Sequence, residues 1–152
     1  MSAQTPGDLS RPAAPPTAVG GRLGYLLKHA QLRLAAFTAP ALAPFGITGR
    51  EVAVLMTIDD PVPLSQQDVA GRLGVDRTTM VALIDGLQDK GLVRRRPDPA
   101  DRRRNVVTLT GAGHTTMAGA IAASDDAERR FLSKLSADDA ASLRAALRVI
   151  AF

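Results

Sequence analysis

The sequence predicts a mainly α-helical fold that carries one small β-hairpin. Apolar residues recur at helical spacing along most of the chain after residue 22, whereas residues 92–110 hold two short alternating segments around a turn rich in Pro, Asp and Arg. A chain of 152 residues can bury one core, and an aromatic content of 3% means that this core consists mostly of Leu, Val, Ile, Ala and Met. We therefore expect one domain, or one domain with a small helical accessory.

The N-terminal part divides into an arm and a helix. Residues 1–20 hold four prolines and little apolar surface, so we expect a disordered arm. Helical spacing then begins, with apolar positions at Leu23, Leu26, Leu27, Ala30, Leu34 and Phe37. Pro40 and Pro44 are expected to kink or end this first helix, because proline has no N–H to donate.

Three further helices are marked by their N-caps. Thr48 with Glu51 forms a capping box, and its helix has an apolar stripe of Val52, Leu55, Met56 and Ile58 before it ends at residues 59–61. Ser65 with Asp68 opens a third, short helix, whose inward residues are Val69, Ala70 and Leu73. Asp76 opens a fourth, with Met80, Leu83, Ile84 and Leu87 inward. The tight turn around Gly74, a left-handed cap, makes the last two a helix-turn-helix.

The remainder predicts a hairpin and two helices. Residues 92–96 and 105–110 alternate as strands around an extended loop, an arrangement known as a wing. A long helix follows from about 113 to 135, with Met117, Ile121, Phe131, Leu132 and Leu135 on its apolar side. Ser136 caps a last helix that bears Leu143, Leu147 and Ile150. These terminal helices are too apolar to stand alone, and we expect them to pack against the first helix, within one chain or between two.

The charge is concentrated around the hairpin. Between residues 90 and 104 seven basic residues face two acids, a local balance of +5, whereas the whole chain carries 19 − 15 = +4. Sixteen of the nineteen basic residues are Arg, whose guanidinium suits phosphates and guanine edges. Such asymmetry indicates a nucleic-acid face.

Several other classes are disfavoured. The chain has no cysteine, which excludes disulfides and Cys-ligated zinc and is compatible with the cytoplasm. His29 and His114 lie far apart and have no metal-ligand spacing, and no catalytic constellation or phosphate-binding glycine loop is present. We therefore expect no enzyme activity, no metal and no cofactor. No segment has the pattern of a signal peptide or is long enough to span a membrane.

Three stretches together resemble the MarR (multiple-antibiotic-resistance regulator) family of winged-helix transcription factors. They are ITGREVAVLMTI (47–58), LSQQDVAGRLGVDRTTM (64–80) and GLVRRRPDPADRRRNVVTLT (91–110). The Asp-Pro-x-Asp-Arg-Arg pattern at 98–103 is the specific part. The resemblance covers the chain from about Leu23 to the C-terminus.

The resemblance implies a function and a domain organisation. We expect a homodimeric repressor that binds a near-palindromic operator in double-stranded DNA and releases it when a small aromatic or anionic effector arrives. Residues 21–47 and 111–152 would form the helical dimerisation region, and residues 48–110 the winged helix-turn-helix lobe. Such a regulator would act in the cytoplasm, without a membrane partner.

The expected DNA contacts lie on the fourth helix, the start of the third helix and the wing. The candidates are Gln66, Gln67, Arg77, Thr78, Thr79, Val81, Ala82, Arg94, Arg96, Arg102, Arg103 and Arg104. Thr78 and Thr79 are also candidates for cap support beside Asp76. Val81 and Ala82 would contact thymine methyls, so we expect specificity to depend on A·T-rich shape and on the wing.

At the wing, the resemblance implies an arginine in the minor groove. The matching position is Arg103, or Arg102 if the register differs, and a narrow A·T groove would favour its guanidinium. Asp101 is expected to brace the tip by an ion pair. Because side chains alternate along a strand, Arg95 should face the side opposite Arg94 and Arg96.

An effector pocket is predicted where the family has one, between the first, second and long fifth helices and the DNA-binding lobe. The candidate lining residues are Tyr25, Lys28, His29, Arg33 and Arg50, whose cations would suit an anionic phenol; ordinary surface positions are the other interpretation. Two other functions remain open. A non-specific architectural protein would bind operator and random duplex alike, and a winged-helix protein-interaction module would have no need of the Arg102–Arg104 cluster.

Overall fold

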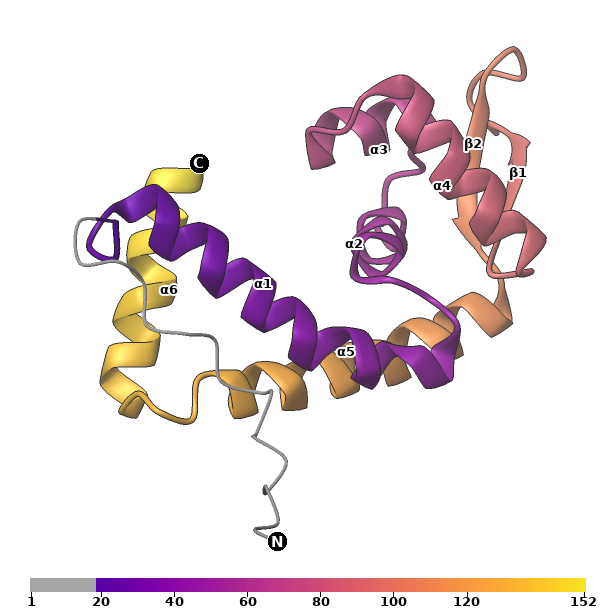
Figure 1. Cartoon of the computed structure of the whole chain (residues 1–152). Helices are drawn as coiled ribbons and strands as arrows, with labels where there is room; N and C mark the ends of the chain where they lie inside the picture. Colours follow the sequence, from indigo (N-terminus) through magenta and orange to yellow (C-terminus); the bar gives the residue numbers. More distant parts are fainter. Residues whose placement is uncertain (1–18) are drawn as a thin grey trace, which may run out of the picture. The chain divides into compact units, whose positions relative to one another are not determined.

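The computed structural model describes residues 19–152 (Figure 1). The chain divides into two compact units after Arg33, and helix α1 (Leu23–Leu42) crosses that boundary. The predicted arm falls, up to residue 18, outside the described residues. In residues 19–152 no single helix is long and apolar enough to cross a membrane, although Leu23–Phe45 and Gly49–Ile58 meet the length and composition requirement together as a bent pair.

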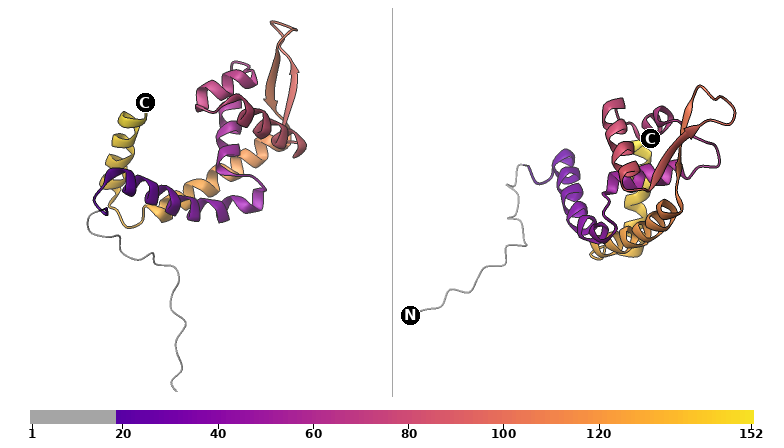
Figure 2. Two further views of the ribbon diagram at one scale, coloured as in Figure 1. Left: turned by 45° about the horizontal axis from the view of Figure 1, so that its top comes forward. Right: turned by 90° about the vertical axis from the view of Figure 1, so that its right-hand side faces the viewer.

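The second unit, from Leu34 onward, confirms the predicted class of helices with one hairpin. After α1 come the short 3-10 helix η1 (Ala43–Phe45) and helices α2 (Gly49–Ile58), α3 (Gln66–Leu73) and α4 (Arg77–Asp89). Strands β1 (Val93–Pro97) and β2 (Asn105–Leu109) pair antiparallel, and helices α5 (Gly111–Phe131) and α6 (Ala137–Ala151) follow. Both views of Figure 2 show the loop between β1 and β2 extending beyond α3 and α4.

Helix α2 is the centre of the winged lobe, because it contacts α3, α4, α5 and β2. Its residue Leu55 packs in a core whose largest fully buried members include Val69, Met80, Ile84 and Leu87. The prediction that Met56 belongs to this core is wrong, because its side chain is 53% exposed and Val54, 1% exposed, is buried instead. A helix with partners on several sides buries more than one stripe, and spacing alone does not show which additional residue is buried.

The predicted caps of α2, α3 and α4 are confirmed. The Thr48 and Ser65 hydroxyls accept from the amides of Glu51 and Asp68, whose carboxylates accept in return from the amides of Thr48 and Ser65, both at 2.8 Å. Asp76 caps α4, and its carboxylate accepts from the Thr79 amide at 3.0 Å. Gly74 ends α3 at φ 61°, a left-handed conformation that favours glycine.

The first helix ends between its two prolines, in agreement with the prediction, whereas the end of the long helix differs. Pro40 lies inside α1, which ends at Leu42, and Pro44 lies in η1. A proline so near the end of a helix removes a single backbone bond, so the last turn still forms. Helix α5 ends at Phe131 instead of Leu135, because residues 132–135 form tight turns before Ser136 caps α6.

An ion pair between the buried carboxylate of Glu51 and the exposed side chain of Lys90 joins α2 to the end of α4. Glu51 is 6% exposed, and Lys90 donates to its Oε1 at 2.6 Å while the Thr48 amide and hydroxyl donate to its Oε2. Burial raises the pKa of Glu51, but the hydrogen bonds from Lys90 and Thr48 outweigh it and hold that pKa below its ordinary value of 4.5. The carboxylate therefore stays ionised and fixes two helices at once.

The Glu51→Gln variant should lose this pairing. We expect the free energy of unfolding at neutral pH to fall by about 1–3 kcal/mol, because the Lys90 ammonium loses its charged acceptor. Since the pKa of Glu51 is depressed in the folded state, its stabilisation is present above the unfolded-state pKa and disappears as the pH falls through the folded-state pKa. Urea titrations at several pH values should therefore show the unfolding free energies of wild type and Glu51→Gln converging at acidic pH. Glu128→Gln, which removes the exposed partner of Arg144, is the control and should change stability little.

The base of the hairpin is locked to the start of α5. The Thr110 hydroxyl donates to the Gly91 carbonyl at 2.7 Å and accepts from the Gly113 amide at 3.0 Å, and the Thr110 amide donates to the Leu92 carbonyl. A Cβ at Gly113 would lie 2.0 Å from the Leu92 carbonyl oxygen, closer than any real contact. Only glycine allows α5 to approach β1 this closely.

Gly113→Ala should therefore destabilise the fold by about 1–3 kcal/mol, as overpacking against backbone does. Gly111→Ala, two residues earlier on the same helix, is the matched control, because nothing lies within 4 Å of its Cβ position. Thermal denaturation should show a lower Tm for the first variant and an unchanged or higher Tm for the second. Equal Tm values for the two variants would contradict the proposed close approach.

Candidate nucleic-acid interface

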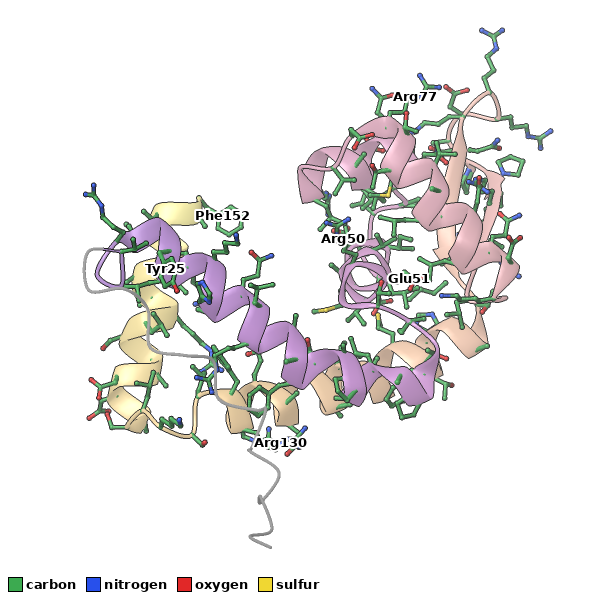
Figure 3. The ribbon with its side chains drawn as sticks, viewed as in Figure 1. Tyr25, Arg50, Glu51, Arg77, Arg130 and Phe152 are labelled. Carbon is green, nitrogen blue, oxygen red and sulfur yellow. The ribbon has the colours of Figure 1, made fainter. Side chains whose placement is uncertain are left out.

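A basic cleft of about 870 Å³ lies between the helix-turn-helix and the hairpin. It is lined by the start of α3, the start of α4 and the hairpin, and its polar side chains include Gln66, Gln67, Arg77, Arg95, Arg103 and Arg104. Figure 3 shows Arg77 at the end of the lobe from which the hairpin loop extends. The structure thus brings together residues from three of the predicted contact segments.

The hairpin loop is held open by two aspartates. Asp98 Oδ1 accepts from the Ala100 amide at 2.9 Å, and Asp101 Oδ1 accepts from the Arg103 amide at 3.0 Å. The ion pair expected at Asp101 is not found within residues 19–152, where Asp98 instead lies 4.0 Å from Arg104 Nε. Asp101 therefore braces the tip through the backbone. A short aspartate side chain in a tight turn lies closest to the amides that follow it in the chain, and so binds one of them.

Two of the arginines that line the cleft are bound within the protein. Arg95 donates to Asp85 Oδ1 at 2.5 Å, to Gln88 at 2.9 Å and to Gln66 at 3.3 Å. Arg104 pairs with Asp68 across the cleft. Hydrogen bonds from Ser65, with a smaller contribution from Arg104, hold the pKa of Asp68 below its ordinary value, so the Asp68 carboxylate stays charged beside the Arg104 guanidinium.

The other basic residues of the lobe are exposed. Arg77, Arg94, Arg96, Arg102 and Arg103 form no ion pair with any residue in the described range 19–152. Unpaired guanidinium groups on one lobe produce a positive potential that attracts phosphates. Arg102 and Arg103 stand at the tip of the loop and are the best placed of the five to enter a groove.

The strand register separates Arg95 from its neighbours, as predicted. Arg95 lies opposite Val107, on the face of the hairpin that packs on the core, whereas Arg94 and Arg96 lie on the other face. The cleft is lined by Arg95 and by neither neighbour. Sequence reasoning missed Arg95 as a cleft residue although it predicted the alternation, because the sequence does not show which hairpin face turns toward the helices.

At the start of α4, one of the two threonines supports the helix cap, which is one of the two roles predicted for it. Arg77 and Thr78 are exposed, but the Thr79 hydroxyl donates to Asp76 Oδ2 at 2.6 Å and supports the cap. This bond is the main reason why the pKa of Asp76 lies below its ordinary value. Farther along, Val81 is half-buried and Ala82 is exposed, so both offer only apolar surface.

The candidate effector residues lie in both units. Tyr25, Lys28, His29 and Arg33 belong to the first unit, where the Tyr25 and His29 rings pack with their centroids 4.1 Å apart. Arg50, in the second unit, lines a separate hollow of about 410 Å³ with Val54 and Leu83. Within residues 19–152, no group of three or more His, Asp or Glu is arranged to hold a metal ion. The shared effector pocket stays a prediction.

Comparison with known proteins agrees with this geometry. Residues 45–104 match the sequence profile of the MarR family. The transcriptional regulator HosA of Escherichia coli O111:H- is 32% identical over 93 residues, which are 61% of this chain and 69% of HosA. The chain belongs to the MarR family. Its members are transcriptional regulators, and the profile match covers the helix-turn-helix, strand β1 and the hairpin loop described above.

Solved structures of the family extend the likeness to nearly the whole chain. The transcriptional repressor CouR bound to a 23-mer DNA duplex superposes with a TM-score of 0.83 at 33% identity, covering 90% of this chain and 96% of CouR. CouR from Rhodococcus jostii RHA1 bound to p-coumaroyl-CoA gives a TM-score of 0.78 at 30% identity, with the same coverage of both chains. The fold outside residues 45–104 is therefore that of the MarR family as well.

Proposed function

We propose that this chain is a sequence-specific DNA-binding transcriptional repressor that acts as a homodimer in the cytoplasm. Residues 48–110 would bind DNA, and residues 21–47 and 111–152 would join the two protomers. The observation that carries the proposal is the basic cleft between α3, α4 and the hairpin, flanked by the unpaired arginines of the loop tip. We assign no catalytic role to any residue.

The elements that flank the cleft support a placement of the duplex. The major and minor grooves are separated by a single sugar-phosphate strand, so a helix in one groove and a loop in the next must straddle that strand. Here α4 and the hairpin loop flank a cleft lined by Arg77 and Arg103. We place α4 in the major groove, Arg103 or Arg102 in the adjacent minor groove, and the intervening phosphates in the cleft.

The exposed apolar surface of α6 supports a dimer. No residue of α6 is buried, and Leu143, Leu147 and Ile150 are 40%, 38% and 67% exposed on one stripe of the helix. In the first unit Leu23, Leu26 and Leu27 are also exposed. A helix with such a stripe is stable only when the stripe is covered. We propose that a second copy of the chain covers it, so that two lobes contact half-sites ~34–36 Å apart.

We also propose an effector that is aromatic and anionic. CouR, the relative described above, has been solved with p-coumaroyl-CoA, whose acyl group is aromatic and whose carrier is negatively charged. Tyr25, Lys28, His29 and Arg33 supply an aromatic ring and cations along one stretch of α1, and Arg50 supplies a further cation on α2. The effector would release DNA only if it binds more tightly to a conformation of the dimer that does not bind the operator.

Footprinting tests the function directly. Purified protein should protect a near-palindromic site in the DNA upstream of its own gene or its neighbours, and should bind that site at least about 10³-fold more tightly than random duplex of equal length. Equal affinity for both duplexes would instead identify a non-specific architectural protein. Absence of binding to any duplex would favour a protein-interaction module.

Arg103→Ala should weaken operator binding by about 1–3 kcal/mol, because a guanidinium in a narrow minor groove interacts with concentrated negative potential. Fluorescence anisotropy at moderate salt measures the change. Lys134→Ala, which removes the same charge between α5 and α6, is the control and should leave the affinity unchanged. If Arg103→Ala binds normally and Arg102→Ala does not, the register of the tip is shifted by one residue; normal binding by both variants would contradict a groove contact.

Leu147→Glu should dissociate the dimer, because it places a charge in the proposed apolar interface. Ala141→Glu lies on the opposite, arginine-bearing side of α6 and should leave the dimer intact. Sedimentation velocity distinguishes the two states. A wild-type chain that sediments as a monomer at micromolar concentration would contradict the dimer.

A further inference from the structure

Two acidic side chains of the helix-turn-helix hold cleft arginines that come from the hairpin. Asp85, on α4, binds Arg95 of β1 at 2.5 Å, and Asp68, on α3, binds Arg104 of the loop. Four arginines line the cleft, and these two pairs engage half of them before any DNA is present. Asp68 lines the cleft itself, and Asp85 is an exposed carboxylate that binds a cleft arginine. An acidic group beside a phosphate-binding surface is otherwise unfavourable, so the position of both carboxylates calls for a functional explanation.

An arginine affects DNA binding differently when it is already paired. Each phosphate that a protein neutralises releases condensed counterions, and the logarithm of the binding constant then falls with the logarithm of salt by about 0.9 per phosphate. Arg95 has Asp85, Gln88 and Gln66 as acceptors and its side chain is only 27% exposed. To neutralise a phosphate, Arg95 must first leave these three partners. Its charge therefore adds little to the number of phosphates that the protein neutralises.

We propose that Asp85 and Asp68 are specificity-determining residues that limit how many phosphates the lobe neutralises. The inference rests on the proposed DNA-binding function. By holding Arg95 and Arg104 in intramolecular ion pairs, the two aspartates leave Arg77 and Arg103 as the cleft cations available to the DNA strand. The paired arginines act as positioning residues that hold the hairpin at a fixed distance from α3 and α4.

Limiting the phosphate count favours the operator over random DNA. Non-specific binding is almost entirely electrostatic, whereas operator binding also includes contacts with base edges and with groove shape. If two fewer cations neutralise phosphates, non-specific binding therefore loses a larger fraction of its binding free energy than operator binding does. The lobe keeps a strongly basic surface for recruitment and still discriminates between sequences.

Asp85 allows the cleaner test of the two. The Asp68 carboxylate also caps α3, where it accepts from the Ser65 amide and hydroxyl, so its removal would weaken the helix itself. Asp85 is 53% exposed and has no capping role. Asp89, one turn later on α4 and also exposed, forms no ion pair within residues 19–152, and Asp89→Asn makes the same change of charge without releasing an arginine.

The experiment compares the salt dependence of binding for wild type, Asp85→Asn and Asp89→Asn. Each full-length protein is titrated with the operator and with a random duplex of roughly three helical turns, from 50 to 200 mM salt. We expect Asp85→Asn to bind random duplex with a slope steeper by about 0.9, which is a further ~3.5-fold loss of affinity over that range. Its ratio of operator to random affinity should fall. Asp89→Asn should match wild type in both quantities.

Arg95→Gln provides an independent measurement. If Arg95 neutralises no phosphate in the wild-type complex, Arg95→Gln keeps the wild-type salt dependence on random duplex, even where its affinity changes. A slope shallower by about 0.9 would mean that Arg95 already neutralises a phosphate, and would overturn the proposal. So would an unchanged slope for Asp85→Asn, or an equal increase for Asp85→Asn and Asp89→Asn. Thermal melting of each variant confirms that the folded protein is being compared.

The same titrations distinguish failure of the proposed function from failure of the role assigned to the aspartates. If the wild-type chain does not discriminate between operator and random duplex, the proposed function is wrong. If it discriminates and the Asp85→Asn slope does not change, the function stands and the role assigned to the aspartates is wrong.

Discussion

The arrangement of the lobe depends on the buried carboxylate of Glu51. One of its oxygens completes the cap of α2 through Thr48, and the other holds Lys90 at the end of α4. Helix α2 in turn contacts α3, α5 and β2. Because a charged group that is 6% exposed is tolerated only when fully paired, the structure is constrained to keep the start of α2 beside the end of α4. That constraint sets where the opposite end of α4, with Arg77, is presented.

A second constraint fixes the hairpin relative to the same frame. The Thr110 hydroxyl bridges the Gly91 carbonyl and the Gly113 amide, and the missing Cβ of Gly113 allows α5 to approach Leu92. The wing and the start of α5 are therefore one rigid junction, and the Asp85 and Asp68 ion pairs add two lateral contacts to the helix-turn-helix. The contacts at the base of the hairpin and the two ion pairs together hold the loop at a fixed distance from α4. The cleft between them therefore has a defined width.

The local structure could be predicted from the sequence because it is encoded locally. Capping boxes, a glycine with positive φ and alternating strands depend on residues within a few positions of one another, and the caps at Thr48, Ser65 and Asp76 follow from them. The resemblance to the MarR family rests on three stretches together, of which the Asp-Pro-x-Asp-Arg-Arg wing at 98–103 is the specific part. The family profile covers residues 45–104, and the predicted lobe spans nearly the same segment.

The features that could not be predicted from the sequence depend on which face of a strand or helix packs against the core. Strand alternation separated Arg95 from Arg94 and Arg96, but the choice of face needed the core contact of Val107. The commitment of Thr79 to Asp76, the pairing of Arg104 with Asp68 and the burial of Val54 in place of Met56 are likewise decided by tertiary neighbours. At each of these positions a side chain has two possible environments, and only the fold selects between them.

The central claim is that one DNA strand lies in the cleft between α4 and the hairpin loop. A crystal structure of the chain with its operator duplex tests this most directly. The account predicts α4 in the major groove, Arg103 or Arg102 in the adjacent minor groove, and backbone phosphates between them near Arg77, with Asp85 still bound to Arg95. A complex in which the duplex contacts Arg94 and Arg96 on the outer face of the hairpin, and leaves the cleft empty, would contradict it.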